Sequence, residues 1–284
     1  MRTTLDCLPC LLRGALESVR MASPHPRIHE RIMRELLHDL SETSMDSSPP
    51  VLAQSLHRRL RGLTGVEDPY RSAKNEQNCL ALKFLNDMKG EINTAADPLA
   101  TAVRLAIAAN IIDLGAKTGI ESKDIRAALT RAVREPVTGD MDDFRAAVSQ
   151  ARNILYLADN AGEIVFDRLL IEQLSPARVT LVVRGKPVIN DATMVDARSV
   201  GLHSIVEVID NGSDAPGTVL ADCRPEFIRR FHAADLVLAK GQGNFETLGD
   251  VRRNIFFLFK VKCAVIASHV GLPAGTNLLL HRRV

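Results

Sequence analysis

The second half of the 284-residue chain alternates short apolar segments, rich in Val, Ile and Leu, with segments of helical periodicity. The short segments predict strands at residues 153–159, 178–185, 204–210, 234–241 and 262–268. Strand, helix and strand at this spacing predict a mostly parallel sheet, covered by helices on both faces and joined by right-handed crossovers. Such α/β sheets bind ligands beyond the carboxyl ends of their strands, so functional residues are expected there.

Before about residue 150 the apolar periodicity is that of helices. It predicts helices at 8–19, 28–40, 50–61, 69–90, 98–117 and 122–134, with a polar loop at 41–50. The helix at 98–117 is apolar on most sides but carries Asn110 and Asp113, which are three residues apart and so share a face. Polar groups on such a helix need partners, and two explanations stay open: a structural hydrogen bond to the neighbouring domain, or a place in the functional site.

Composition excludes several classes of protein. Lys and Arg number 36 against 34 Asp and Glu, and there is no Trp, so nothing indicates a nucleic acid or an anionic membrane as partner. We find no apolar run long enough to cross a membrane, and the first residues do not resemble a secretory signal. Five cysteines are too few for a disulfide framework, so we expect a cytoplasmic protein, and its oligomeric state stays open.

Polar residues cluster where four of the predicted strands end. Asp159 and Asn160 follow the first, and Asp191 lies after the second. Carboxylate and amide oxygens are hard donors, which favour Mg²⁺ or Mn²⁺ over zinc. The alternatives for these residues are a helix N-cap and an Asx turn.

The third and fourth strand ends add groups suited to an anion. Lys240 offers a compact positive charge beside Gly241, whose backbone can approach an anion closely, and Gly212 and Ser213 offer a similar turn. A metal, a lysine and exposed amides together favour phosphoryl transfer. The chain lacks the dinucleotide-binding glycine motif, the P-loop, the Asp-x-Asp of haloacid dehalogenase-like enzymes and the Gly-x-Ser-x-Gly nucleophile elbow.

The chain as a whole resembles the damage-control phosphatase family, also called the acidic-residue methyltransferase-like domain and formerly a domain of unknown function. The motifs that carry the resemblance are Cys-Leu-Pro-Cys at 7–10, Asp-Pro-Tyr-Arg at 68–71, Ala-Asn-Ile-Ile-Asp at 109–113, Leu-Ala-Asp-Asn-Ala-Gly-Glu at 157–163, Pro-Val-Ile-Asn-Asp-Ala-Thr at 187–193, Asp-Asn-Gly-Ser-Asp-Ala-Pro-Gly-Thr at 210–218 and Lys-Gly-Gln-Gly-Asn-Phe-Glu-Thr-Leu at 240–248. The Cys-x-x-Cys resembles that of the stand-alone prokaryotic branch.

The resemblance implies a metal-dependent phosphatase that acts on small phosphorylated metabolites such as sugar phosphates. It implies Asp159, Asn160 and Asp191 as ligands of Mn²⁺ or Mg²⁺, with other divalent transition metals as further options. It also implies that Lys240 and Asn244 contact phosphate. The family fold is a small all-helical N-terminal domain beside a three-layer α/β/α domain with a mixed sheet, so we expect domains at residues 1–95 and 96–284.

Several alternatives remain at this point. The attacking group is either a metal-bound water or the Asp159 carboxylate. Arg184 is either an outer contact to the substrate or a solvated surface charge. A non-catalytic protein that binds a metal or metabolite is the main alternative to an enzyme, and a carboxyl methyltransferase that uses S-adenosylmethionine ranks last. Cys7 and Cys10 supply half of a structural zinc site, so simple packing competes with a second metal or a redox role.

Overall fold

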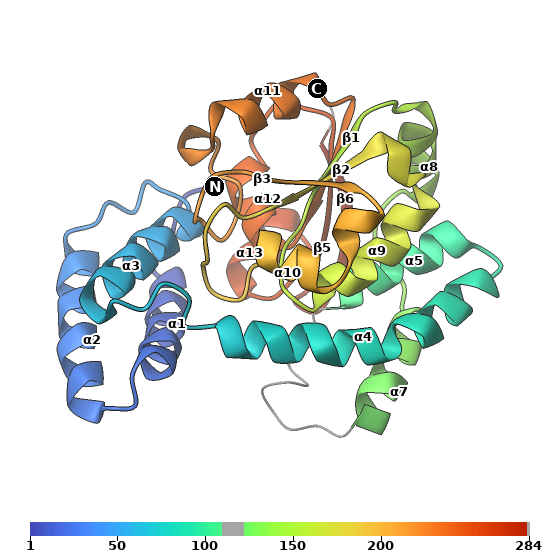
Figure 1. The fold of residues 1–284 in the computed structure, drawn as a ribbon. Helices are drawn as coiled ribbons and strands as arrows, with labels where there is room; N and C mark the ends of the chain where they lie inside the picture. Colours follow the sequence, from blue (N-terminus) through green and yellow to red (C-terminus); the bar gives the residue numbers. More distant parts are fainter. Residues whose placement is uncertain (110–121, 283–284) are drawn as a thin grey trace.

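A computed structural model of the chain describes residues 1–109 and 122–282. Asn110 and Asp113, and the end of the helix predicted at 98–117, lie outside the described residues. The first half of the chain is helical, as predicted (Figure 1). Its helices are α1 (Cys7–Ala22), α2 (Pro26–Ser41), α3 (Pro49–Thr64), α4 (Arg71–Asn93), α5 (Pro98–Ala108), α7 (Ser122–Ala132) and α8 (Met141–Gln150).

The second half forms a six-stranded sheet in the order β3-β2-β1-β4-β5-β6. The first five are parallel, and β6 pairs antiparallel with β5 at one edge. The strands are β1 (Ile154–Leu157), β2 (Val179–Val183), β3 (Glu207–Asp210), β4 (Leu236–Lys240), β5 (Ile255–Lys260) and β6 (Asn277–Arg282). The connecting helices are α9 (Glu163–Gln173), α10 (Met194–Ser199), α11 (Pro225–Ala233), α12 (Gln242–Leu248) and α13 (Ala264–Val270), with short 3-10 turns at Pro176–Arg178, Leu202–Ser204 and Leu220–Asp222.

Apolar side chains cover both faces of the sheet. On one face, alternate residues such as Tyr156 and Leu238 join a core with α4, α5 and α9. On the other, Leu157 and its neighbours pack against the phenylalanines of α11 and α12. Strands buried on both faces read as continuous apolar runs, which is why the sequence identified them without alternation. The predicted α/β class with a mostly parallel sheet is confirmed.

One strand prediction was wrong, and two strands were not predicted. Residues 262–268 form most of α13, which begins after Cys263. The fifth strand is instead the run Ile255–Lys260, and β6 follows near the C-terminus. A short apolar run does not by itself distinguish a buried strand from one side of a short helix.

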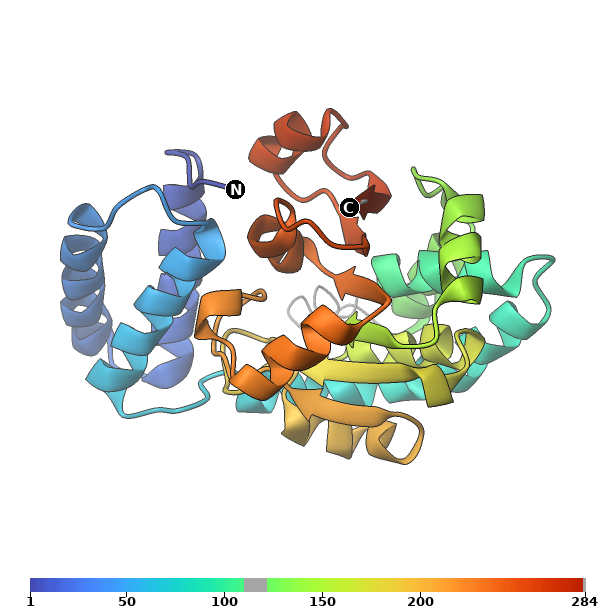
Figure 2. The same ribbon diagram turned by 90° about the horizontal axis from the view of Figure 1, so that it is seen from above.

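The first three helices form a small core of their own. It consists of Ala15, Val19, Ile32, Leu36, Leu56 and Leu60. These helices lie side by side beside the sheet (Figure 2, blue). The next helix, α4, extends from this group along the sheet and contributes Phe84 and Met88 to the main core (Figure 1). The domain boundary near residue 95 stays a prediction.

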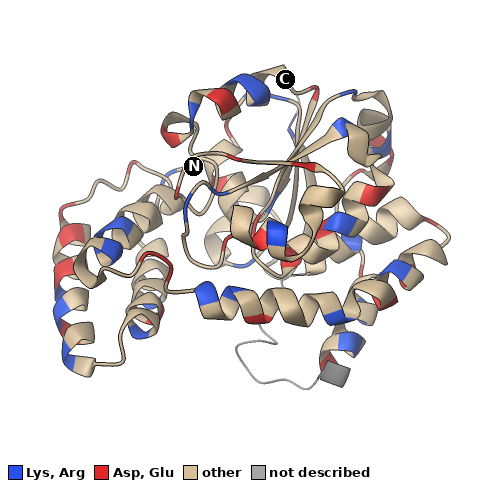
Figure 3. Cartoon of the chain, viewed as in Figure 1, with Lys and Arg blue, Asp and Glu red and all other residues tan. Residues whose placement is uncertain are grey.

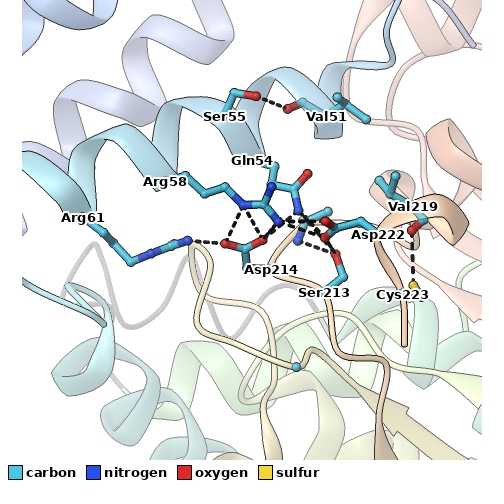
Figure 4. Close-up of polar contacts among 12 residues, drawn as sticks. Val51, Gln54, Ser55, Arg58, Arg61, Ser213, Asp214, Val219, Asp222 and Cys223 are labelled. Carbon is cyan, nitrogen blue, oxygen red and sulfur yellow. Dashed lines mark hydrogen bonds and ion pairs between the residues drawn. The ribbon is translucent and has the colours of Figure 1, made fainter. Parts of the chain in front are cut away.

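A charged contact fastens α3 to the loop after β3 (Figure 4). Asp214 is buried and accepts hydrogen bonds from Gln54 Nε2 at 2.7 Å and Arg58 Nε at 2.9 Å, and it pairs with Arg61. Burial alone would raise the pKa of Asp214, but the hydrogen bonds from Arg58 and Gln54 hold it below its ordinary value. Charged residues are otherwise interspersed along the helices (Figure 3). None of the described helices combines the length and apolarity needed to cross a membrane.

Replacing Asp214 with Asn is expected to destabilise the protein by roughly 2 kcal/mol, because Arg61 then lacks its carboxylate and Arg58 keeps only that of Asp222. The matched control is Asp46→Asn, since Asp46 pairs with Arg2 where both side chains are more than 70% exposed, and such pairs contribute little. Urea unfolding of both variants measures the difference. Equal stability of the two variants would contradict the role given to Asp214.

Candidate active site

The polar clusters after β1, β2 and β4 meet at one edge of the sheet, because these strands are parallel neighbours. The segment after β2 returns along the end of β1, where Asn160 and Asp191 form an isolated antiparallel bridge. The backbone N–H of Ala192 donates to the carbonyl oxygen of Asp159 at 2.8 Å. These bonds bring Asp159, Asn160 and Asp191 together, as the sequence predicted.

Asp159 and Asp191 are both buried at this edge. Burial, together with the negative charges of Glu163 and Asp191, raises the pKa of Asp159 to about 8. Burial also raises the pKa of Asp191, although the Arg184 guanidinium acts in the opposite direction. Two carboxylates held out of water with raised pKa values form a site that gains free energy from a bound cation.

Asn160 turns its amide nitrogen toward neighbouring carboxylates. Its Nδ2 donates to Asp159 Oδ2 at 3.0 Å and to Glu163 Oε1 at 2.8 Å. Both bonds use the nitrogen, so the oxygen of the same amide is left to serve as a ligand.

Gly241 packs directly against Asp159. A Cβ at this position would lie 2.0 Å from Asp159 Oδ2, and the residue has a φ of +80°. Only glycine therefore fits beside this carboxylate. The N–H of Gly241 donates to the carbonyl of Leu258 at 3.0 Å, so that amide serves the sheet rather than an anion.

The residues at this edge fit a hard divalent cation. Asp159 and Asp191 supply carboxylate oxygens and Asn160 an amide oxygen, the donor types that Mg²⁺ and Mn²⁺ prefer. Within residues 1–109 and 122–282, no group of three or more His, Cys, Asp and Glu side chains is arranged to hold a metal. The candidate ligand set is therefore two carboxylates and an amide, with positions left for water and substrate.

Lys240 lies at the end of β4 and is fully buried. Its Nζ is 2.8 Å from Asp167 Oδ1 and 3.6 Å from Glu163 Oε2, and Tyr156 also donates to Asp167. Burial alone would lower the pKa of Lys240, but the charges of Asp167 and Glu163 raise it above its ordinary value. The ammonium group offsets part of the negative charge of these two carboxylates, and its predicted contact with phosphate stays a prediction.

The Asn244 side chain uses both ends of its amide within the protein. Its nitrogen donates to the carbonyl oxygens of Lys240 at 2.7 Å and Ala158 at 3.3 Å. Its oxygen accepts from Thr218 Oγ1 at 2.8 Å and from Arg184 Nη1 at 3.2 Å. In this arrangement Asn244 joins three loops, and its predicted phosphate contact stays a prediction.

Gly212 and Ser213 lie in the loop that α3 holds. Gly212 has a φ of +83°, and a Cβ on Gly185 would lie 2.3 Å from its carbonyl carbon. Ser213 Oγ donates to Asp222 at 2.6 Å. The structure thus connects these two residues to β2 and to the helical part, and no contact brings them to Asp159 within the described residues.

Cys7 and Cys10 lie in the first turn of α1. Burial raises the pKa of the Cys10 thiol, and so do the nearby acidic groups of Cys263, Glu246 and Cys7. Thiols from α1 and from the start of α13 therefore lie near one another, all of them free. The second metal or redox role of Cys7 and Cys10 stays a prediction.

Comparisons with known proteins agree with the motifs. The family model of the damage-control phosphatase ARMT1-like domain matches residues 3–278 of this chain. This chain belongs to that family. It is 32% identical over 289 residues to a damage-control phosphatase of Pyrococcus horikoshii, covering 100% of this chain and 99% of the relative. It is 34% identical over 283 residues to a damage-control phosphatase of Archaeoglobus fulgidus, covering 97% of each.

The fold of this family member is also found among solved structures. The crystal structure of a DUF89 family protein from Pyrococcus horikoshii has a TM-score of 0.92, at 30% identity and with 100% of both chains covered. The whole chain, including the helical part, therefore shares the arrangement of that protein.

From the sequence, Arg184 was open between an outer contact to the substrate and a solvated surface charge, and Glu163 and Asp167 had no role of their own. Arg184 directly follows β2 and is buried beside Asp191. Glu163 and Asp167 are four residues apart on α9 and both approach Lys240. The spacing of Glu163 and Asp167 was a signal that they share a helix face, but their buried cationic partner is far away in the sequence.

Replacing Gly241 with Ala is expected to weaken Mn²⁺ binding at least about 10-fold, because the added methyl group displaces the Asp159 carboxylate. Gly201→Ala is the control, since Gly201 has a φ of +75° with nothing within 4 Å of an added Cβ. The control carries the strain of a left-handed residue, about 1 kcal/mol, without the collision. Gly241, at φ +80° and ψ +159°, lies in a region that glycine alone adopts, so its variant carries a larger strain as well. Titration calorimetry with Mn²⁺ compares the two, and equal affinities would contradict the packing argument.

Proposed function

We propose that this protein is a metal-dependent phosphatase that hydrolyses phosphomonoesters of small metabolites. The observation that carries the proposal is the buried group of Asp159, Asn160 and Asp191 at the carboxyl edge of a parallel sheet. Its oxygen donors suit Mn²⁺ or Mg²⁺, and the edge is where such sheets bind ligands. The names of the relatives, damage-control phosphatases, support the same reaction class.

Asp159, Asn160 and Asp191 would hold the cation. A divalent cation bound there supplies Lewis-acid polarisation of the phosphoryl oxygens. Glu163 fixes the Asn160 amide, and Gly241 fixes the position of the Asp159 carboxylate. The Arg184 guanidinium keeps a positive charge beside both carboxylates, at 2.7 Å from Asp191 and 3.8 Å from Asp159. Preorganised charges of this kind stabilise the charge that develops on the phosphoryl group.

The attacking oxygen comes from water or from Asp159. Attack by water displaces the alcohol directly, whereas attack by Asp159 forms an acyl phosphate that water then hydrolyses. In single-turnover reactions in ¹⁸O-labelled water, label in Asp159 shows an acyl phosphate that water opened at the carboxyl carbon. Label in phosphate arises both from direct attack by water and from attack of water on the phosphorus of an acyl phosphate. Trapping the acyl phosphate with hydroxylamine or borohydride distinguishes these last two routes.

We expect the protein to release phosphate from p-nitrophenyl phosphate and from members of a sugar-phosphate panel in the presence of Mn²⁺, and to lose this activity in EDTA. Asp191→Asn should lower kcat/KM at least about 100-fold, because one charged ligand is lost. Asp235→Asn is the control: Asp235 is exposed and bonds the backbone of Arg152 and Asn153 before β1, at the opposite edge of the sheet.

Two outcomes would replace the proposal. Saturable binding of a phosphorylated metabolite with no phosphate release would make this a non-catalytic binding protein. Methyl transfer from S-adenosylmethionine is the remaining alternative, and equilibrium binding of that compound tests it. Full activity after EDTA treatment would refute metal dependence while leaving phosphatase activity in place.

A further inference from the structure

Arg184 is the residue whose surroundings the proposed reaction leaves least explained. It follows β2 and is 2% exposed, so its guanidinium is enclosed by protein. Its Nε donates to Asp191 Oδ2 at 2.7 Å, and its Nη1 donates to Thr218 Oγ1 at 3.4 Å and to Asn244 Oδ1 at 3.2 Å. Three loops therefore fix the plane of the guanidinium.

The remaining nitrogen, Nη2, is different. It is buried and makes no hydrogen bond within the described residues, and it lies 3.8 Å from Asp159 Oδ1. A buried donor without an acceptor is costly to folding, and a guanidinium has two hydrogens on each terminal nitrogen. An ordinary structural arginine would have these hydrogens paired, as Arg178 does with the backbone carbonyls of Val148, Ala151 and Leu174.

The position of Nη2 indicates which kind of acceptor would complete its hydrogen bonding. It lies 3.8 Å from Asp159, a candidate metal ligand, so an acceptor that enters the site comes within its reach. The acceptor must also tolerate two nearby carboxylates, which favours an anionic oxygen that is shared with a cation. A phosphoryl oxygen has this chemistry, and arginine recognises phosphate through its planar N–H groups.

Lys240 does not take this role in the structure, because its ammonium group is already paired with Asp167 and Glu163. Gly241 and Asn244 likewise use their donors within the protein. Arg184 combines contacts to both candidate carboxylates with a buried donor that is unused within the described part of the chain.

We propose that Arg184 binds the phosphoryl group of the substrate through Nη2, while its other nitrogens remain fixed on Asp191, Thr218 and Asn244. The proposal rests on the proposed phosphatase function. It assigns the contact with the transferred phosphoryl group to the residue directly after β2, rather than to the Lys-Gly loop after β4. It also makes Arg184 a resident counter-ion that lowers the repulsion between Asp159 and Asp191.

The test separates phosphate binding from metal binding. Calorimetry first measures Mn²⁺ alone, and then inorganic phosphate at saturating Mn²⁺, for the wild-type protein, Arg184→Gln and Arg184→Lys. We expect phosphate affinity to fall about 10- to 100-fold in both variants. Mn²⁺ affinity should be unchanged in Arg184→Lys, and unchanged or higher in Arg184→Gln, since a competing positive charge is removed. Arg229→Gln, which removes an exposed charge on α11, should alter neither affinity.

Other results overturn the proposal. Wild-type phosphate affinity in the folded variants would do so, as would a wild-type protein that binds Mn²⁺ but no phosphate. A parallel loss of Mn²⁺ and phosphate binding with a lowered Tm would assign Arg184 a purely structural role. Where Arg184→Gln does not fold, Arg184→Lys alone decides, because it keeps the charge and loses the planar donors. The phosphatase function fails separately, if the wild-type protein releases no phosphate from any ester.

Discussion

The arrangement of the site depends on two buried carboxyl groups, those of Asp159 and Asp191. Burial and the negative charge of Glu163 raise the pKa of both carboxyl groups. Two hydrogen bonds offset part of the free-energy cost of burying these groups. The Arg184 guanidinium donates to Asp191, and the Asn160 amide nitrogen donates to Asp159. Such a buried pair is costly to stability and is typical of functional sites, which supports the proposed cation site.

A second buried network lies behind the site. Lys74 of α4 pairs with Asp196 at 2.8 Å, and Asp196 also caps α10, directly after the Asp191 loop. From the same helix, Asn78 accepts a hydrogen bond from the backbone N–H of Gly162 at 2.7 Å. The α4 helix therefore supports the loops that follow β1 and β2 at once.

The helix α3 contacts two further loops of the sheet. Arg61 donates to the carbonyl of Pro187 at 3.1 Å and pairs with Asp214, so it joins the loops after β2 and β3. The helical part therefore contacts the loops at the carboxyl ends of the strands directly. It holds the backbone of the loops that carry Asp191 and Thr218, and this explains how an extended set of loops can present fixed side chains.

Sequence periodicity and strand-end composition predicted the α/β class, the first four strands and the meeting of Asp159, Asn160 and Asp191. They failed at β5 and β6, because the apolar residues of α13 resemble a strand as closely as the true β5 does. They also missed the internal pairing of Lys240 with Asp167, and the burial of Arg184. In a sequence, a charged residue at a strand end looks the same whether its side chain faces water or a buried carboxylate. Only its neighbours in the folded structure show which of the two it faces.

The predicted phosphate contacts show the same limit. Lys240 and Asn244 were singled out by their motif, and the structure shows that both also have partners inside the protein. Asp214 belongs to a motif as well, yet its carboxylate fastens α3. A motif marks which residues matter together, whereas the contacts determine which of them remain open to a ligand.

The central claim is that Asp159, Asn160 and Asp191 form a metal site at the carboxyl edge of the sheet. Anomalous diffraction from crystals grown with Mn²⁺, recorded on both sides of the manganese absorption edge, tests it most directly. We expect the strongest manganese peak between the Asp159 and Asp191 carboxylates, within ligand distance of Asn160 Oδ1. A manganese peak at the Cys7 and Cys10 thiols or on the surface, with none between the two carboxylates, would contradict it.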